Sequence, residues 1–141
     1  MRRMTPDEAI AFLREGARTA HVATTRADGS PHVVPVWYIV DGDAVAFTIA
    51  RDSVKARNLA RDPRLTVSVD DDVFPYSFAT VSGRAEIADR PANFLDWTTR
   101  IAHRYVGEAR AAEYGARNFE LDDWVVRLRP ERIFAAAEIA F

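Results

Sequence analysis

The sequence has no cysteine in its 141 residues, which excludes disulfide bonds, thiolate nucleophiles and metal centres ligated by cysteine. It also has no apolar run long enough to span a bilayer, and the opening Met1-Arg2-Arg3-Met4 is not followed by the apolar core of a signal peptide. We therefore expect a cytoplasmic protein with no membrane partner.

An excess of charge of either sign is also missing, because 19 Lys and Arg residues stand against 21 Asp and Glu residues, a formal net charge of -2 at pH 7. Such a chain has no general attraction to nucleic acids, so any cationic binding site must be local. Lysine is nearly absent, and Lys55 is the only one. The length and the 48% hydrophobic content predict one soluble domain over residues 1–141.

Motifs for catalysis by side chains alone are absent too. The 3 histidines, at positions 21, 32 and 103, share no metal-ligand spacing, and no serine lies in a nucleophile elbow. The triplet Asp70-Asp71-Asp72 lacks the ligand spacing and the glycine of a calcium loop. We therefore predict no metal site and assign no catalytic residue from the sequence.

Alternation of apolar and polar residues predicts a chain made mainly of strands. The predicted strands cover residues 19–25, 32–40, 44–50, 64–69, 80–87, 124–128 and 133–141. Asp28-Gly29 marks a hairpin between the first two strands. Pro35 lies inside the second strand and lacks an N–H for the ladder, so it marks an edge, a bulge or backbone that faces a ligand.

Helices are predicted between these strands. Thr5, Pro6 and Glu8 form a capping box that starts the first helix, which ends at Gly16. A second helix follows residue 53, a third starts at Asp89-Arg90-Pro91 and runs to about residue 105, and a short fourth covers residues 108–114 before Gly115. Short strands with helices between them predict a closed or nearly closed antiparallel β-barrel with peripheral helices.

The stretch from Ala44 to Pro63 is a strand, a polar turn and a helix, with Asp52 or Ser53 as the N-cap. This arrangement directs main-chain N–H groups and the helix dipole at one place, which suits a phosphate. Hydroxyls and cations at this place come from Thr48, Arg51, Ser53, Lys55 and Arg57. The simpler alternative is a short amphipathic helix whose arginines point into water.

Two aromatic segments complete the candidate features. Val36-Trp37-Tyr38 forms a wide apolar surface, which serves either core packing or the stacking of a ligand. The segment Phe74-Pro75-Tyr76-Ser77-Phe78 places three aromatic side chains in a loop, where they are costly to expose. We interpret this loop as the lip of a pocket or as part of an interface.

A series of motifs resembles the flavin and deazaflavin split-barrel proteins, the relatives of pyridoxamine 5'-phosphate oxidase. They are Gly29-Ser30-Pro31-His32-Val33-Val34-Pro35-Val36-Trp37-Tyr38, Asp41-Gly42, Phe47-Thr48, Lys55-Ala56-Arg57-Asn58-Leu59 and Arg61-Asp62-Pro63-Arg64. The similarity extends from about Ala9 to Ile87 and is greatest to the deazaflavin-dependent reductases that use coenzyme F420. It implies a six- to seven-stranded antiparallel split β-barrel.

The resemblance also implies a function and a set of binding residues. The function is an F420-dependent oxidoreductase that transfers a hydride from reduced deazaflavin to a small unsaturated organic substrate. The assembly is a homodimer with cofactor sites at the subunit interface. The implied cofactor-binding residues are Pro35, Val36 and Trp37 along the ring, Ala50, Arg51, Ser53, Lys55 and Arg57 at the phosphate, Thr48 and Asn58 beside them, and Tyr76 and Phe78 reaching the cofactor of the other protomer.

Two alternatives stay open at this point. An FMN-binding oxidase or reductase on the same scaffold needs the same phosphate grip, although the arginine and histidine set for a pyridoxamine phosphate substrate is missing. The other alternative is a non-catalytic protein that binds a cofactor or haem, with His21, His32 or His103 as a possible axial ligand.

Overall fold

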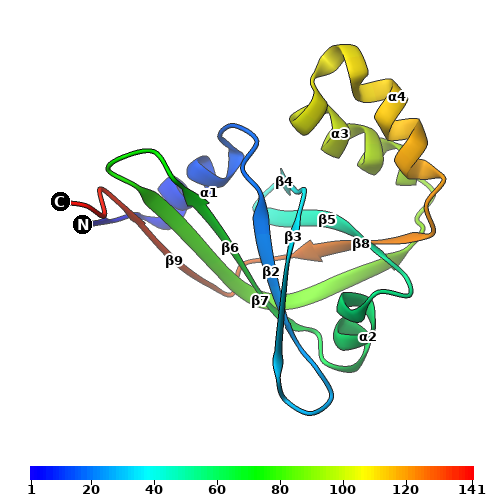
Figure 1. Cartoon of the computed structure of the whole chain (residues 1–141), viewed down its shortest axis with the longest axis horizontal. Coiled ribbons are helices and arrows are strands. Elements are labelled where there is room, and N and C mark those ends of the chain that lie inside the picture. The colour runs from blue at the N-terminus through cyan, green and yellow to red at the C-terminus, as the bar shows by residue number, and fades with distance from the viewer.

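The computed structural model describes all residues from Met1 to Phe141, and its strands curl into a half-barrel surrounded by four helices (Figure 1). The strands are β1 (Arg2–Arg3), β2 (Ala20–Thr25), β3 (Pro31–Val36), β4 (Ile39–Asp41), β5 (Ala44–Ala50), β6 (Arg64–Asp71), β7 (Ser77–Asp89), β8 (Asp123–Leu128) and β9 (Arg132–Ala137). The helices are α1 (Pro6–Arg14), α2 (Val54–Arg61), α3 (Phe94–Val106) and α4 (Glu108–Phe119). The predicted antiparallel split barrel with peripheral helices is confirmed.

The strands follow the order β3-β2-β6-β7-β8-β5-β4, with β9 paired to β7 and β1 paired to β9. Every pairing is antiparallel. Strand β7 connects the two halves of the sheet, because residues 78–82 pair with β9 and residues 85–89 pair with β8. None of the helices is long and apolar enough to cross a membrane.

The predicted strand over residues 32–40 was wrong, because the chain breaks it into two strands at Trp37 and Tyr38. β3 pairs with β2 at one end of the sheet, whereas β4 pairs with β5 at the other. The main-chain N–H of Tyr38 donates to the hydroxyl of Tyr105 (3.0 Å), and the buried Tyr38 hydroxyl donates to the carbonyl of Leu13 (2.7 Å). The Tyr105 hydroxyl therefore takes the place of a ladder acceptor for the Tyr38 N–H, and the bond to Leu13 fixes the Tyr38 side chain.

The position of Pro35 agrees with one of its predicted alternatives, the edge strand. β3 is the terminal strand of the sheet path. The main-chain N–H of Arg26 donates to the carbonyl of Ser30 (2.9 Å). Hydrogen-bonded and non-hydrogen-bonded pairs alternate along an antiparallel hairpin, so the next hydrogen-bonded residues of β3 are His32, Val34 and Val36. At position 35 a main-chain N–H would point away from β2. A proline, which has no N–H, therefore removes no hydrogen bond of the β2–β3 ladder there.

Several strand ends differ from the predictions. The β6–β7 ladder continues to the pair Asp71 and Ser77, so β6 ends two residues later and β7 begins three residues earlier than the apolar pattern indicates. β9 ends at Ala137 because Glu138 adopts a φ of 55°, a left-handed conformation that interrupts an extended strand. Alternation of apolar residues cannot detect either effect.

Helix α1 begins as its capping box predicts. The Thr5 hydroxyl accepts from the N–H of Glu8 (3.2 Å), and the Glu8 carboxylate accepts from the N–H of Thr5 (3.1 Å). Ala9, Phe12 and Leu13 lie on one face of the helix and are buried. This face closes one side of the main hydrophobic core.

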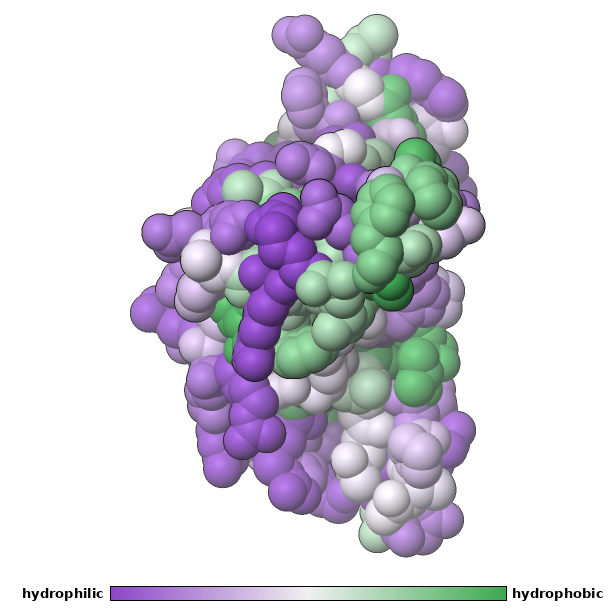
Figure 2. Space-filling view, turned by 90° about the vertical axis from the view of Figure 1, so that its left-hand side faces the viewer, coloured by the Kyte–Doolittle hydropathy of each residue, from purple (hydrophilic) through white to green (hydrophobic).

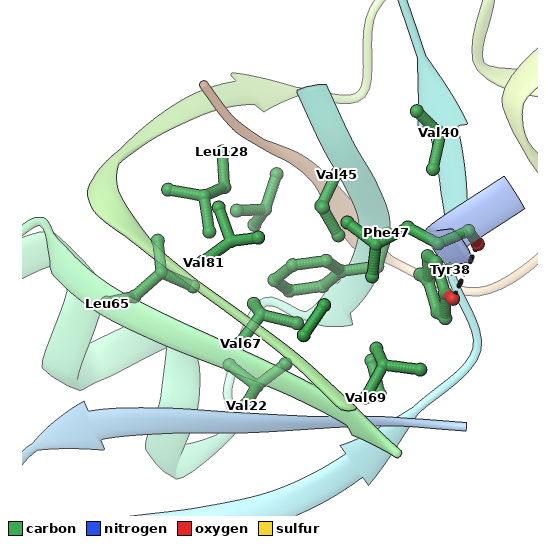
Figure 3. Close-up of a cluster of buried hydrophobic side chains, with 14 of the residues drawn as sticks. Val22, Tyr38, Val40, Val45, Phe47, Leu65, Val67, Val69, Val81 and Leu128 are labelled. Carbon is green, nitrogen blue, oxygen red and sulfur yellow. Dashed lines mark hydrogen bonds between the residues drawn. The ribbon is translucent and has the colours of Figure 1, made fainter. Parts of the chain in front are cut away.

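Phe47 of β5 lies in the middle of the main core. Figure 3 shows its ring between Val45, Val67 and Val81, with Leu65 and Leu128 farther out. The Phe47 side chain has 0% of its surface exposed, as do Val67 and Val81. The core thus joins strands from both halves of the curled sheet around one aromatic ring.

A second, smaller core lies between the sheet and α3. Phe94, Trp97 and Ile101 are buried there against β4, β5 and β8, as their helical spacing predicts. The predicted start of this helix was wrong, because Asp89 is the last residue of β7 and α3 begins at Phe94. Residues 90–93 form the connection between them, and no side chain caps the helix.

Gly115 does not end a helix, as the sequence predicted, but lies within α4. A Cβ atom at this position would come within 2.4 Å of Oγ1 and 2.8 Å of Cα of Thr99 on α3. The Gly115 carbonyl also accepts a hydrogen bond from the hydroxyl of Thr98 (2.8 Å). The glycine therefore permits the close approach of α3 and α4.

Gly115→Ala should lower the free energy of unfolding by about 1–2 kcal/mol, because the overpacking cost exceeds the gain in helix propensity of roughly 1 kcal/mol. Urea denaturation followed by circular dichroism measures the change, with exposed Ala116→Ser as the control in the same helix. A more stable Gly115→Ala protein would contradict the packing argument, since helix propensity alone favours alanine.

Candidate functional site

The amino end of α2 carries the strongest candidate site. Ser53 is the N-cap, and its hydroxyl accepts from the N–H of Ala56 (3.1 Å) and donates to the carbonyl of Ala50 (2.7 Å). This decides between the two predicted caps in favour of Ser53. The first N–H that donates within the helix is that of Arg57, to the carbonyl of Ser53 (3.1 Å), so the N–H groups of Val54 and Lys55 have no acceptor in the helix and remain available to an anion.

The two cations of the first turn form no salt bridge. The Lys55 side chain is partly buried and forms no hydrogen bond or salt bridge within the chain, although its charge acts on the Asp123 carboxyl. Arg57 donates to the carbonyl of Asp52 (2.7 Å) and forms no ion pair with a carboxylate. Because unpaired cations and free N–H groups meet at one helix end, the site fits an anionic group such as a phosphate.

His32 is the residue that sequence reasoning missed as part of this site, although it was considered as a haem ligand. Its Nδ1 atom is buried and has no hydrogen-bond partner. Burial lowers the pKa of His32, and the charges of Arg26 and Lys55 lower it further. The histidine therefore lies within electrostatic range of Lys55 and has an unsatisfied ring nitrogen.

A sequence signal for His32 did exist in the strand alternation. His32, Val34 and Val36 have the same parity in β3, and their partners in β2 are Thr24, Val22 and Ala20. All three partners are buried, so this row of β3 faces the inside of the curled sheet. Treating His32, Val34 and Val36 as one face of the strand would have predicted that the His32 imidazole lies on the same face as the two valines.

Arg51 lies close to the site, but its guanidinium is engaged elsewhere. It donates to the Asp122 carboxylate (3.1 Å) and to both carboxylate oxygens of Asp89. The hydrogen bonds to Asp89 and then to Asp122 raise the pKa of Arg51, and the same contact lowers the pKa of Asp89. The structure thus gives Arg51 the role of joining the end of β5 to β7 and to the start of β8.

Asn58 and Thr48 also have partners within the chain. The buried Asn58 amide donates to the Thr24 hydroxyl (3.0 Å), which joins α2 to β2. Burial raises the pKa of Asp123, while a hydrogen bond from Thr48 and the charge of Lys55 oppose this rise. The polar side-chain groups of Asn58 and Thr48 are therefore engaged within the chain near Lys55 and are not free to bind a ligand.

Trp37 forms a platform at the end of β3. Its ring stacks on Tyr105 of α3 with a centroid distance of 4.8 Å and an interplanar angle of 5°. The Tyr105 hydroxyl donates to the carbonyl of Arg18 (2.8 Å) and accepts from the main-chain N–H of Tyr38 (3.0 Å). These two hydrogen bonds hold the Tyr105 ring in place under Trp37. Trp37 is still 41% exposed, which leaves aromatic surface for a flat ligand.

β3 connects the two parts of the candidate site. The charge of Lys55 acts on the imidazole of His32 near the start of β3, and Val36 ends this strand, with Trp37 after it and exposed Pro35 before it. The rise per residue separates His32 from Val36 by about 13 Å. The donor set and the strand length fit an elongated molecule with an anionic group at one end and a flat ring at the other.

Tyr76 and Phe78 do not join this site within one chain. They belong to the β6–β7 turn and the start of β7, on the opposite side of the molecule from α2 (Figure 1). Phe78 lies against Phe134 of β9 at a centroid distance of 5.7 Å. Tyr76 packs edge-on against Phe74, which in turn contacts Phe141.

Figure 2 shows apolar side chains gathered on this side of the molecule. The exposed fractions reach 66% for Val73, 63% for Phe74 and 76% for Phe141. We refer to Val73, Phe74, Tyr76, Ile139 and Phe141 as the aromatic patch. It is a surface rather than a pocket within the single chain.

The largest hollow of the molecule lies on neither of these surfaces. It has a volume of about 720 Å³ on the outer face of β2, β6 and β7, and arginines 64, 84 and 132 lie along it. No group of three or more histidine, aspartate and glutamate side chains in the structure is arranged to hold a metal ion. Lys55 and Trp37 do not line this hollow.

Comparison with known proteins identifies the fold. The family model of pyridoxamine 5'-phosphate oxidase matches residues 6–136, so the similarity continues well beyond the segment that carries the sequence motifs. A conserved hypothetical protein from Mycobacterium tuberculosis has 26% identity and a TM-score of 0.83, covering 96% of this chain and 86% of that one. A solved F420 reductase has 29% identity and a TM-score of 0.69, covering 86% and 93%.

More distant structures share the fold alone. The haem storage protein of Vibrio cholerae has 21% identity and a TM-score of 0.72, covering 93% of this chain and 94% of that one. An FAD-binding protein from Mesorhizobium loti has 19% identity and a TM-score of 0.69, covering 95% and 93%. Flavin, deazaflavin and haem proteins are therefore all found among the structural neighbours. From the match over residues 6–136, the chain belongs to the pyridoxamine 5'-phosphate oxidase family.

Proposed function

We propose that this protein is an F420-dependent oxidoreductase, which transfers a hydride from reduced deazaflavin to a small unsaturated organic substrate. The observation that carries the proposal is the pair of cations without a salt bridge, Lys55 and Arg57, at the amino end of α2. The 29% identity to an F420 reductase over 86% of the chain supports the deazaflavin over other cofactors.

Each part of the site has a distinct task in this proposal. Lys55, Arg57 and the free N–H groups of the first turn of α2 hold the anionic part of the cofactor. Trp37, stacked on Tyr105, and the neighbouring Pro35 and Val36 support the flat ring. When bound, the deazaflavin supplies the hydride, and the protein orients the ring and excludes water from it.

The remaining predicted residues contribute indirectly. Ser53 fixes the direction of α2, Asn58 fixes the helix to β2, and Arg51 holds the end of β5 through Asp89 and Asp122. The main chain at Ala50 accepts the Ser53 hydroxyl, so it shapes the turn before the helix. We assign no proton donor to the reaction.

A binding function without catalysis is the second candidate. His32 favours it, because its Nδ1 atom is buried without a partner, whereas a histidine that only fills space is usually hydrogen-bonded. A haem iron could take this nitrogen as an axial ligand. His21 and His103 are exposed and offer no comparable feature.

Titration of the purified protein with F420, FMN and haem separates these functions. Tryptophan fluorescence follows the first two ligands, because Trp37 lies on the proposed ring surface, and the Soret band follows haem. We expect the tightest binding for F420. Tighter binding of FMN would overturn the choice of cofactor, and a Soret shift that is lost in His32→Ala would establish the haem function instead.

We further propose that the protein is a homodimer whose cofactor sites lie at the subunit interface, with Tyr76 and Phe78 reaching the site of the other protomer. The aromatic patch supports this assembly, because such large apolar side chains are costly to leave in water.

The dimer is testable by light scattering. The protein at micromolar concentration should have the mass of two chains, and Phe74→Asp should shift the population toward the monomer, because a carboxylate would be buried unpaired. Leu95→Asp, at a residue with 48% exposure on α3, is the matched control and should remain dimeric. A monomeric wild-type protein would refute the assembly.

A further inference from the structure

A second cationic cavity is lined by residues of α1, β4 and α3, three elements that lie away from α2 in Figure 1. Its volume is about 500 Å³, within the range of sites for small organic ligands. Arg14, Arg100, His103 and Arg104 line it. None of the residues assigned to the proposed cofactor site lines this cavity, so it needs an explanation of its own.

Two of the three guanidiniums in this cavity have no carboxylate partner. Arg14 donates to the carbonyls of Val40 and Gly42. Arg104 donates to the carbonyl of Leu13 (3.0 Å), and its guanidinium lies over the ring of Tyr38 at 4.3 Å. Neutral carbonyls and an aromatic ring do not neutralise a guanidinium, so Arg14 and Arg104 both keep their full positive charge.

Arg104 also carries an unsatisfied donor, because its Nε atom is buried and has no hydrogen-bond partner. Among the residues that line the cavity, only Arg100 forms salt bridges. Asp41 accepts from Arg100 (3.1 Å) and from Arg127 (3.0 Å between Nη2 and Oδ2), and Asp96 lies 3.8 Å from Arg100. The local charge therefore stays positive, and it is concentrated on Arg14 and Arg104.

The remaining lining is apolar or neutral. Ile39 and Val40 of β4 are 7% and 8% exposed, and Thr99 of α3 adds one hydroxyl. A cationic rim around a nearly buried aliphatic surface is complementary to a molecule that combines an anionic group with a hydrocarbon part. A bare inorganic anion would leave the apolar part of the cavity unused.

We propose that this cavity binds a small organic anion, a carboxylate or phosphate carried on an apolar body, through Arg14, Arg100 and Arg104. The proposal is independent of the cofactor site, because Lys55 and Arg57 belong to α2 and do not line the cavity. The carboxylate and the phosphate share this recognition chemistry, so both are tested.

Calorimetric titrations at constant ionic strength use hexanoate, hexyl phosphate, inorganic phosphate and hexanol as probes. At least one of the two hexyl anions should bind the wild-type protein, and which of them binds more tightly identifies the anionic group. Hexanol should bind at least about tenfold more weakly, since it lacks the charge-assisted hydrogen bonds. Equal affinities for hexanol and the hexyl anions would overturn the proposal, and so would equal affinities for inorganic phosphate and hexyl phosphate.

Arg14→Gln and Arg100→Gln should each weaken binding of the hexyl anions by about tenfold. Arg14 is exposed, so its variant is expected to fold even if loss of the Asp41 contact destabilises Arg100→Gln. Arg110→Gln on the exposed side of α4 is the control, and it should bind the hexyl anions as the wild type does. Unchanged affinity in Arg14→Gln, with its fold verified by circular dichroism, would refute the assignment.

Discussion

Replacing Lys55 and Arg57 together by alanine is expected to weaken F420 binding by at least about a hundredfold. Each side chain can give the anionic part of the ligand a charge-assisted hydrogen bond worth roughly 1.5–3 kcal/mol, and a factor of ten in affinity corresponds to about 1.4 kcal/mol. Fluorescence titration of the double variant and of both single variants measures the losses.

The fold should tolerate these changes. Lys55 has no partner within the chain, and Arg57 has only the carbonyl of Asp52, so the unfolding midpoint in urea should stay close to that of the wild type. Arg110→Ala together with Arg117→Ala removes the same charge from α4 and is the matched control. If the double variant at positions 55 and 57 binds F420 as tightly as this control, the cation pair does not hold the cofactor and the proposed function loses its basis.

Phe47→Ala is expected to lower the free energy of unfolding by about 3–5 kcal/mol, a large part of the stability of a chain of this size. The Phe47 ring is fully buried and touches core residues from both halves of the sheet (Figure 3). The strands around it belong to one curled sheet and cannot close over the space that the ring leaves. Urea denaturation should therefore show a much lower midpoint.

Phe134→Ala is the control for this substitution. Phe134 is also an aromatic residue of a strand, but 40% of its surface is exposed on the outer face of β9. We expect a cost of about 1 kcal/mol or less there, because 40% of the surface of this residue already faces water in the folded state and its loss leaves no enclosed cavity. Similar losses at positions 47 and 134 would contradict the location of the main core at Phe47.

Features that depend on neighbouring residues were predictable from the sequence. The capping box of Thr5 and Glu8 starts α1, and Ser53 was one of two predicted caps for α2. Alternation located β6 because it buries one row of side chains, whereas β5 buries residues of both rows and was located by its apolar character. The antiparallel barrel then followed from short turns between short strands.

Features that depend on distant partners were not predictable. Residues 32–40 read as one strand, since Trp37 and Tyr38 favour strands, and only the hydroxyl of Tyr105, 67 positions away, reveals the break. Gly115 read as a helix end because glycine is a weak helix former, while its real role depends on Thr99.

The candidate site shows the same division. A strand, a turn and a helix in sequence were enough to select Lys55 and Ser53. Arg51 was selected for the same reason, but its partners Asp89 and Asp122 are 38 and 71 positions away and occupy its guanidinium. The membership of His32 depends on its distance to Lys55 across the fold, which a linear motif does not contain.

The free side of β3 also affects how the protein behaves when it is concentrated. Pro31, Val33 and Pro35 all turn their main-chain groups away from β2, and two of the three have no N–H to offer. A strand of another molecule that approaches this side meets one main-chain N–H donor, that of Val33. An edge without prolines would present three. Fibril-like growth by strand addition is therefore discouraged at an exposed border of the sheet.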